Sequence, residues 1–155
     1  MKAILIGCVK TKAPEPRPAR ELYTSPLFLA RREYAESTGL PWFIVSARYG
    51  LVAPDAIIEP YDATLAGLDR LGRQTWAHGV RELLEQELPP ERTGTHVLEL
   101  HLGAQYRRPL ERQLWRYQLE TPLIHTPGIM SQVNWYKNQK HTAQEAQKWQ
   151  ISSTD

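Results

Sequence analysis

Residues 2–12 read Lys-Ala-Ile-Leu-Ile-Gly-Cys-Val-Lys-Thr-Lys, and this segment sets the architecture that we expect for the chain. The run from Ala3 to Ile6 is apolar at every position, as in a central strand of a parallel sheet that is buried on both faces. The run stops at Gly7-Cys8, and two lysines follow at alternate positions. A buried strand that ends in this way and leads towards a helix start predicts a site for an anionic ligand.

Further apolar and helical patterns follow in alternation along the chain. The predicted strands cover residues 3–7, 42–47, 95–100 and 122–124. The predicted helices cover residues 25–37, 69–88, 104–116 and 129–149, and the segments 13–22 and 51–67 are expected to be loops. This order predicts an α/β fold: a single-domain three-layer sandwich with a mainly parallel four-stranded sheet and helices on both faces. We expect the domain to span residues 1–150, with a tail at 151–155.

Length and composition exclude several classes of protein. The 155 residues are 41% hydrophobic and 23% charged, which is ordinary for one soluble globular domain. The formal net charge of +2 is too small to indicate nucleic-acid binding by itself. The single cysteine excludes an intramolecular disulfide. Because no signal peptide and no apolar stretch of about 20 residues is evident, we expect a cytoplasmic protein without a membrane partner.

The charges are distributed unevenly along the chain. Residues 1–20 hold five basic residues and one acidic residue, and residues 105–116 hold four arginines and one glutamate. Residues 50–70 are acidic, with four carboxylates and one arginine. The two basic segments and the acidic one could face each other across a cleft, or could form an ordinary mixed surface, and the sequence leaves both possibilities open.

The carboxyl ends of the predicted strands are where a ligand is expected. In open α/β sheets, ligands bind beyond these ends. That rule selects the segments 7–12, 46–50, 100–105 and 125–129. The central geometric expectation is that the residues around Cys8, Arg48 and Tyr106 converge at one edge of the sheet.

Three residues are candidates for catalysis. Cys8 follows the first strand, where a nucleophile could lie, although a free cysteine also packs well as a small buried side chain. Asp55 and Asp62 lie in the long segment 51–67, where a carboxylate could activate water or bind a ribose. Such aspartates also cap turns, so the structural alternative stays open.

The first group of candidate binding residues surrounds the start of the helix predicted at residue 25. Lys10 and Lys12 alternate along the segment after the first strand and could hold a phosphate or a carboxylate. Ser25, followed by Pro26, has the pattern of a helix N-cap. Tyr23 could stack on a base, bind a phosphate or fill space in the loop.

The second group follows the next two strands. Ser46 and Arg48 lie at the end of the strand predicted over 42–47, and the guanidinium of Arg48 suits a nucleotide. Tyr49 offers an aromatic face, and Gly50 permits a positive φ or a close approach of a ligand. Tyr106 lies just inside the helix after Gly103. The histidines do not have the spacing of a metal site, so neither a metal nor a cofactor is predicted.

Several motifs resemble those of known proteins. They are residues 7–12 (Gly-Cys-Val-Lys-Thr-Lys), 19–28, 46–51 (Ser-Ala-Arg-Tyr-Gly-Leu), 59–62 (Glu-Pro-Tyr-Asp) and 103–110. Together they resemble the YaaA-like family of small bacterial and phage proteins, whose label comes from a peroxide-stress protein. The Cys-x-Lys-x-Lys and Tyr-x-Ser pieces are also similar to the lyase-type domain of archaeosine synthases, which is related to the uracil-DNA glycosylase fold. These resemblances imply a role in stress response or in binding nucleotides and DNA.

Two functions of different classes follow, with a third as an alternative. The first is an enzyme that acts on a nucleobase or nucleotide, with an anion-binding pocket at the strand ends. The second is a non-catalytic DNA-binding protein that contacts phosphates through its basic segments. The third is a plain ligand-binding module. The sequence leaves the reaction and the oligomeric state open.

Overall fold

Three buried parallel strands form the centre of the computed structural model, which describes residues 1–152. β1 (Lys2–Gly7) lies between β3 (Trp42–Ser46) and β6 (Val97–His101) and is parallel to both. Its residues Ala3–Gly7 are all buried. The apolar runs of the sequence therefore predicted the central strands correctly, and the expected α/β fold class is confirmed.

Two short strands extend this sheet at its edges, so that its order is β4-β3-β1-β6-β7. β4 (Gly50–Val52) is antiparallel to β3, and β7 (Gln118–Glu120) is parallel to β6. The described sheet thus has five strands instead of four. The strand expected at 122–124 is wrong, because those residues form turns in which the Ile124 N–H donates to the Thr121 carbonyl.

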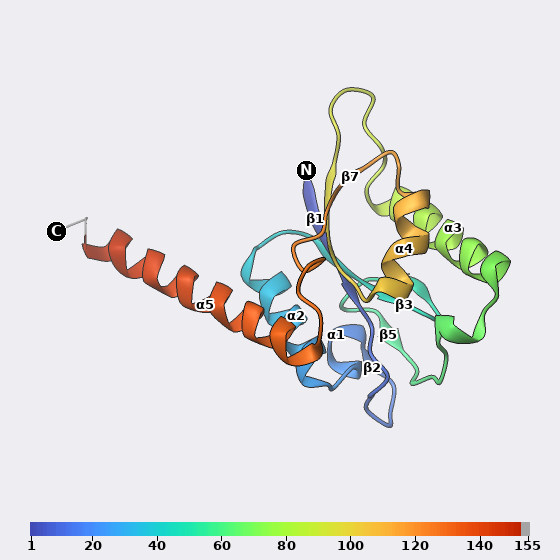
Figure 1. The fold of residues 1–155 in the computed structure, drawn as a ribbon, viewed down its shortest axis with the longest axis horizontal. Helices are drawn as coiled ribbons and strands as arrows, with labels where there is room; N and C mark the ends of the chain where they lie inside the picture. The colour runs from blue at the N-terminus through green and yellow to red at the C-terminus, as the bar shows by residue number, and fades with distance from the viewer. Residues whose placement is uncertain (153–155) are drawn as a thin grey trace.

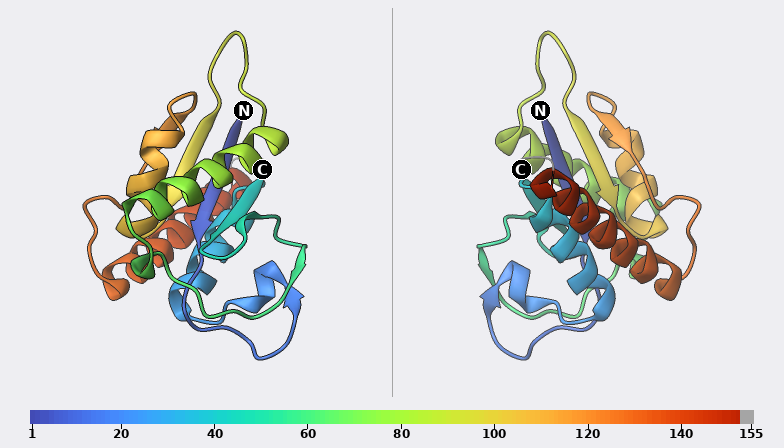
Figure 2. Two further views of the ribbon diagram at one scale, coloured as in Figure 1. Left: turned by 90° about the vertical axis from the view of Figure 1, so that its right-hand side faces the viewer. Right: turned by 90° about the vertical axis from the view of Figure 1, so that its left-hand side faces the viewer.

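Helices cover both faces of the sheet, as Figures 1 and 2 show. α3 (Arg70–Glu87) and α4 (Ala104–Gln113) lie in front of the sheet in the left view of Figure 2. α2 (Pro26–Ser37) and α5 (Ile129–Ser152) lie in front of it in the right view. Alternate residues of β1 serve the two faces: Leu5 packs in the core under α3 and α4, and Ile4 packs in the core under α2. The layers are those of the predicted sandwich.

The helix starts follow the capping pattern of the sequence. The Ser25 Oγ accepts a hydrogen bond from the Phe28 N–H at 3.2 Å, which confirms the predicted cap of α2. The Asp69 carboxylate accepts from the Gly72 N–H at 2.7 Å and caps α3. α4 ends at Gln113 instead of residue 116, because the chain turns there to enter β7.

The two segments expected to be loops contain short elements that pair with each other. The first contains β2 (Arg17–Pro18) and α1 (Ala19–Leu22), and the second contains β5 (Ile57–Ile58) and the 3₁₀ turn η1 (Leu65–Gly67). β2 and β5 form a separate antiparallel pair. Elements of two or three residues carry too little periodicity to be read from a sequence.

α5 is the longest described helix, and its C-terminal half extends away from the sheet in Figure 1. It continues through residue 152, where a tail was expected, and the last three residues of that expected tail lie outside the described part of the chain. No helix within residues 1–152 combines the length and the apolar character needed to cross a bilayer. The expected cytoplasmic location stays a prediction.

Candidate functional site

The carboxyl ends of β1, β3 and β6 meet at one edge of the sheet, and this edge brings several predicted site residues together. The Cys8 N–H donates to the Val45 carbonyl at 3.0 Å, which joins the ends of β1 and β3. The half-buried Cys8 thiol lies 3.6 Å from the Tyr106 hydroxyl, to which it donates. Of the three segments predicted to converge, those around Cys8 and Tyr106 are in contact, and the segment around Arg48 follows the end of β3 that Cys8 contacts.

Beside Cys8, three hydroxyl groups form a chain of hydrogen bonds. The Ser46 Oγ donates to the Tyr61 hydroxyl at 2.8 Å, and the Tyr61 and Tyr23 hydroxyls are 2.7 Å apart. Ser46 is 0% exposed and Tyr23 is 1% exposed. The Lys12 ammonium lies 4.3 Å from the centre of the Tyr61 ring. Tyr23 and Ser46 can therefore reach a ligand only through Tyr61 or Lys12, or after a rearrangement.

Burial dominates the electrostatics of this hydroxyl chain. It raises the pKa of Tyr23 to about 12 and also raises the pKa values of Tyr61 and Tyr106. Burial lowers the pKa of Lys12, and the neighbouring Cys8 opposes that effect. At neutral pH the phenols are therefore protonated, and each can donate one hydrogen bond in addition to those it accepts.

The turn after β3 holds the other predicted residues of that strand end. The Ser46 Oγ accepts hydrogen bonds from the N–H groups of Arg48 and Tyr49, at 3.2 and 3.1 Å. Arg48 is exposed, and its guanidinium lies 5.7 Å from the centre of the Tyr49 ring. Gly50 has a φ of +77°, which is the first of the two roles that the sequence allowed for this glycine. Ser46 therefore shapes this turn, and Arg48 is the exposed cation of this strand end.

The remaining predicted residues lie at the margin of the edge. Asp55 is exposed and forms an ion pair with Arg20 at 2.8 Å. Asp62 is exposed and close enough to Lys12 to influence the pKa of that lysine. Lys10 is exposed, and its carbonyl accepts a hydrogen bond from the Lys12 ammonium. Ser25 caps α2, as described above.

A cavity of about 200 Å³, here called the α4 cavity, lies where β6 leads into α4. Gly103 and Ala104 at the start of α4 line it, together with Arg31 of α2 and Arg107 of α4. Gly103 provides no side-chain cap, and the N–H groups of Ala104 and Gln105 precede the first hydrogen bonds of the helix. The first backbone donor of α4 and two guanidinium groups therefore gather at this cavity, and one of these groups, that of Arg107, is paired with Glu111.

Arg31 is unusual because it is a buried cation. It is 5% exposed, and one terminal nitrogen donates to the Gly7 carbonyl at 3.2 Å. The Nε has no hydrogen-bond partner among the described residues. Burial lowers the pKa of Arg31, while the adjacent Tyr136 phenol opposes that effect. No carboxylate forms an ion pair with Arg31 in the described part of the chain, so its charge lacks the counterion that buried cations normally have.

Gly7 has no side chain, and the Arg31 guanidinium occupies the space that a side chain would take. A Cβ at residue 7 would lie 3.2 Å from the nearest Arg31 nitrogen and 3.5 Å from the His101 carbonyl oxygen. A Cβ at this position would therefore require the guanidinium to shift by a few tenths of an ångström. Gly7 at the end of the first strand therefore has a steric role that the sequence pattern did not reveal.

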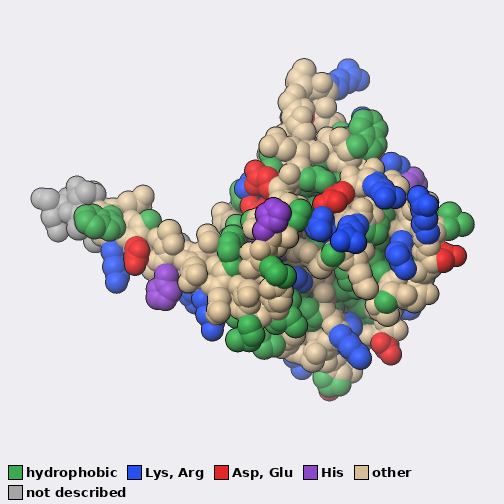
Figure 3. Space-filling model, viewed as in Figure 1, with side chains coloured by type: hydrophobic (Ala, Val, Ile, Leu, Met, Phe, Trp, Pro, Cys, Tyr) green, Lys and Arg blue, Asp and Glu red, His purple; other side chains and the backbone are tan. Residues whose placement is uncertain are grey.

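A second hollow, here called the arginine groove, lies on the other side of the first turn of α4. It has a volume of about 350 Å³, and Arg70 and Arg73 of α3 face Arg108 and Arg112 of α4 across it. Glutamines contribute to its lining, and no acidic residue does. Ala104 lines both hollows. Figure 3 shows Lys and Arg side chains gathered over α3 and α4.

The structure shows how the two basic segments and the acidic segment of the chain lie relative to one another. The acidic segment lies beside the first basic segment, since Asp55 pairs with Arg20 and Asp62 is near Lys12. The acidic segment 50–70 does not neutralise the second basic segment, residues 105–116. Arg108 and Arg112 instead face Arg70 and Arg73, which leaves a hollow of one sign of charge.

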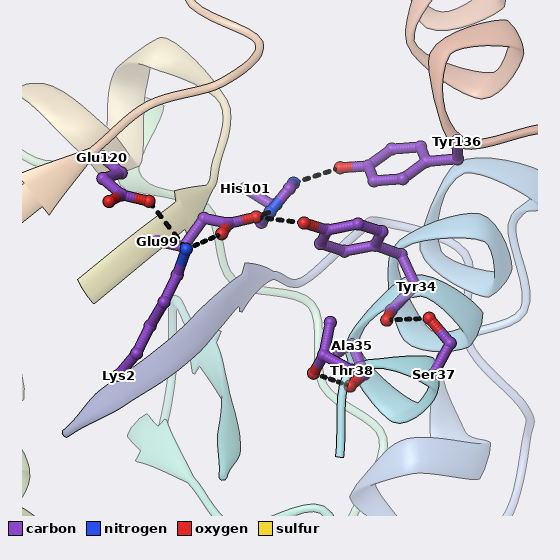
Figure 4. Close-up of polar contacts among 9 residues, drawn as sticks. All are labelled: Lys2, Tyr34, Ala35, Ser37, Thr38, Glu99, His101, Glu120 and Tyr136. Carbon is purple, nitrogen blue, oxygen red and sulfur yellow. Dashed lines mark hydrogen bonds and ion pairs between the residues drawn. The ribbon is translucent and has the colours of Figure 1, made fainter. Parts of the chain in front are cut away.

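A buried polar network on the α2 and α5 face of the sheet is shown in Figure 4. Glu99 and His101 of β6 are 2.8 Å apart, and the other His101 nitrogen is 2.7 Å from the Tyr136 hydroxyl. Glu99 also accepts from the Tyr34 hydroxyl and the Lys2 ammonium. Every polar side chain of this network has a partner, which indicates a structural role.

The two histidines beside and within β6 have different partners. His96 precedes β6 and bonds to the Pro89 carbonyl, whereas His101 is the last residue of β6 and belongs to the buried network. Within residues 1–152, no group of three or more histidine, cysteine or carboxylate side chains could hold a metal ion.

The fold and its carboxyl edge define an α/β protein with a doubly covered, mainly parallel sheet and arginines concentrated around one helix start. A family model matches residues 3–138, and the chain belongs to that family, DUF6884, which is described as a family of unknown function. No curated protein matches the chain. The expected membership of the YaaA-like family is therefore wrong, and the weaker similarity to archaeosine synthases is corrected by the same match.

Two residues of the site, Arg31 and Tyr61, were not predicted as site residues from the sequence. Arg31 fits the helical spacing of α2, and the available signal was a cation on the otherwise apolar face of that helix. Tyr61, which connects Tyr23 with Ser46, was visible only as part of the Glu-Pro-Tyr-Asp motif. Arg70 and Arg73 lie more than 30 residues before Arg108, so only the tertiary structure brings them together.

Proposed function

We propose that this protein binds a phosphate-bearing ligand of the nucleotide class at the carboxyl edge of its sheet, with a phosphate group in the α4 cavity. The observation that carries the proposal is the buried Arg31, which has an unpartnered Nε among the described residues and lines the cavity together with Ala104, the first residue of α4. A phosphate would supply the missing negative charge and the missing acceptors. Helix starts with free N–H groups bind such anions.

The size of the cavity also favours a phosphate group over a large apolar ligand. Its volume of about 200 Å³ is below the roughly 300–1,000 Å³ that is typical for drug-sized ligands. A phosphate with part of its sugar would fill it. The rest of a nucleotide would continue past Ala104, which also lines the arginine groove.

The predicted enzyme is a second candidate, and the contact between Cys8 and Tyr106 is the observation that favours it. The thiol is half-buried at the same edge, one residue from the Gly7 carbonyl that anchors Arg31. Asp55 pairs with Arg20 at the margin and is a weaker candidate than Cys8. Catalysis by Cys8, Asp55 or Asp62 stays a prediction, and binding is the part of the hypothesis that the geometry supports best.

The experiment is a thermal-shift titration of the full chain with inorganic phosphate and a panel of nucleoside monophosphates. A ligand at 100 times its Kd should add about 2.7 kcal/mol of apparent stability. Ala104→Pro removes one N–H donor at the first helical position, where proline is well tolerated, and Gly103 already has the extended backbone that precedes proline (ψ of 155°).

The variants separate binding from folding. We expect Ala104→Pro to fold and to lose most of the shift, and Ala104→Ser, which keeps the N–H, to retain it. Arg31→Met should also lose the shift, whereas Arg32→Met should not, because Arg32 bonds to Glu36 and the Arg20 carbonyl outside the cavity. A panel without any shift, or a shift that Ala104→Pro retains in full, would contradict the proposal.

A further inference from the structure

The arginine groove is a second concentration of positive charge, which a single bound phosphate does not use. Arg70, Arg108 and Arg112 have no ion-pair partner among the described residues, and Arg73 donates only to the Leu65 carbonyl. Like charges repel each other when they line one hollow, and this repulsion disfavours the folded state unless an anion is bound. The positive charge of the groove therefore favours a ligand with several negative charges.

The shape of the groove limits what that ligand can be. It runs between two neighbouring helices, and Arg108 and Arg112 are one helical turn apart, which separates their Cα atoms by about 6 Å along the axis. This spacing is on the scale of successive phosphates in an extended strand. A concave basic groove of this kind follows the backbone of a single strand, whereas a duplex presents a wide convex surface.

The glutamines of the groove distinguish a nucleic acid from a simple polyanion. Gln74, Gln105 and Gln113 line the hollow between the arginines. Their amides can donate to and accept from base edges, as glutamine does in nucleic-acid complexes. Inorganic polyphosphate would use the guanidinium groups and leave these amides without a role.

We infer that the arginine groove binds the phosphodiester backbone of a single-stranded nucleic acid, one nucleotide of which reaches the α4 cavity. The inference rests on the proposed function, because Ala104 lines both hollows and joins the two sites. Arg70 and Arg73 contact the strand from α3, and Arg108 and Arg112 contact it from α4. DNA and RNA share this backbone chemistry, so the experiment uses both.

The experiment measures fluorescence anisotropy of labelled 12-nucleotide DNA and RNA strands with the full chain between 50 and 200 mM salt. For four phosphate contacts, the slope of log binding constant against log salt concentration should be about −3, or roughly 50-fold weaker binding across this range. Arg108→Gln with Arg112→Gln should reduce the slope to about −1.4. The matched control is Arg17→Gln with Arg92→Gln, which removes the same charge from exposed residues outside the groove and should leave the slope unchanged.

The outcomes distinguish this inference from the proposed function. Loss of strand binding in Arg108→Gln/Arg112→Gln, with the nucleotide thermal shift retained, supports the inference. Equal losses in the groove variant and the Arg17→Gln/Arg92→Gln control, or tighter binding of a 12-base-pair duplex than of either strand, would overturn it. If strands bind through the groove but no nucleotide shifts the melting temperature, the proposed function fails and the groove assignment stands alone.

Discussion

The buried network around Glu99 and the arginine-lined hollows around α4 are both polar, but they satisfy their charges differently. In the network, Glu99 accepts from Lys2, Tyr34 and His101, and His101 also meets Tyr136. In the hollows, Arg107 pairs with Glu111, but Arg31, Arg70, Arg108 and Arg112 have no ion-pair partner among the described residues. The difference separates polar residues that maintain the fold from polar residues that are available to a ligand.

The largest effect that can test this contrast is the loss of Glu99. Glu99→Ala would leave His101 and Tyr34 without their shared acceptor inside the protein. Breaking a buried ion pair from one side costs about 3–5 kcal/mol, so we expect a loss of this size in the free energy of unfolding, measured by urea denaturation. Glu120→Gln is the control, since Glu120 is a partly exposed partner of Lys2 alone and should cost less than about 1 kcal/mol. Equal effects of the two variants would contradict a structural role for the network.

The pH dependence of stability should come mainly from the same network. Burial alone would raise the pKa of Glu99, but hydrogen bonds from His101, Lys2 and Tyr34 outweigh it and hold that pKa at about 2. The stabilising contribution of this carboxylate is therefore present above its unfolded pKa near 4.5 and is lost as the pH falls towards 2, on the order of 3 kcal/mol in all. Burial lowers the pKa of His101, so this histidine also destabilises the fold below about pH 6.5, where the unfolded chain takes up the proton.

Urea titrations at successive pH values can separate these two contributions. Wild type should lose stability from pH 6.5 downwards, whereas His101→Gln should be less stable at pH 7 but flat until about pH 5. Stability of the wild type that rises between pH 6.5 and pH 5 would show that His101 is not held in its neutral form.

The smallest expected effect is the change in the free energy of unfolding when groove arginines are replaced. Arg108→Gln with Arg112→Gln removes charges that have no ion-pair partner in residues 1–152, so the free energy of unfolding should change by no more than about 0.5 kcal/mol. Because the substitution relieves repulsion from Arg70 and Arg73, a small gain is the expected sign. A loss above 1.5 kcal/mol in urea denaturation would place these arginines in the fold and remove the contrast with the network.

Long apolar runs and periodic segments were predictable, and short elements were not. The runs Ala3–Gly7 and Trp42–Ala47 predicted β1 and β3 because short apolar runs of five or six residues that end at turn residues are typical of strands buried on both faces. β7 was missed because Gln118-Leu119-Glu120 has a single apolar residue, and the more apolar 122–124 forms a turn. Pairings such as β2 with β5 depend on contacts between distant segments, which local patterns do not encode.

The candidate site was predictable in position but less so in composition. The strand-end rule selected the edge at which Cys8 and Tyr106 meet. It could not select Arg31, because a buried arginine on a helix becomes recognisable only when the cavity beside it is known. Nor could it distinguish the buried Tyr23 and Ser46 from the exposed Arg48, since exposure depends on how the loops pack.

Amide NMR spectroscopy of the ¹⁵N-labelled full chain, titrated with inorganic phosphate, tests the α4 cavity most directly. We predict that the N–H resonances of Ala104 and Gln105 and the Arg31 Nε–H shift together and saturate with one dissociation constant. The Glu99 and His101 amides should move least. Unchanged resonances at Ala104 and Gln105, while scattered surface residues drift linearly with phosphate concentration, would contradict an anion site at the start of α4.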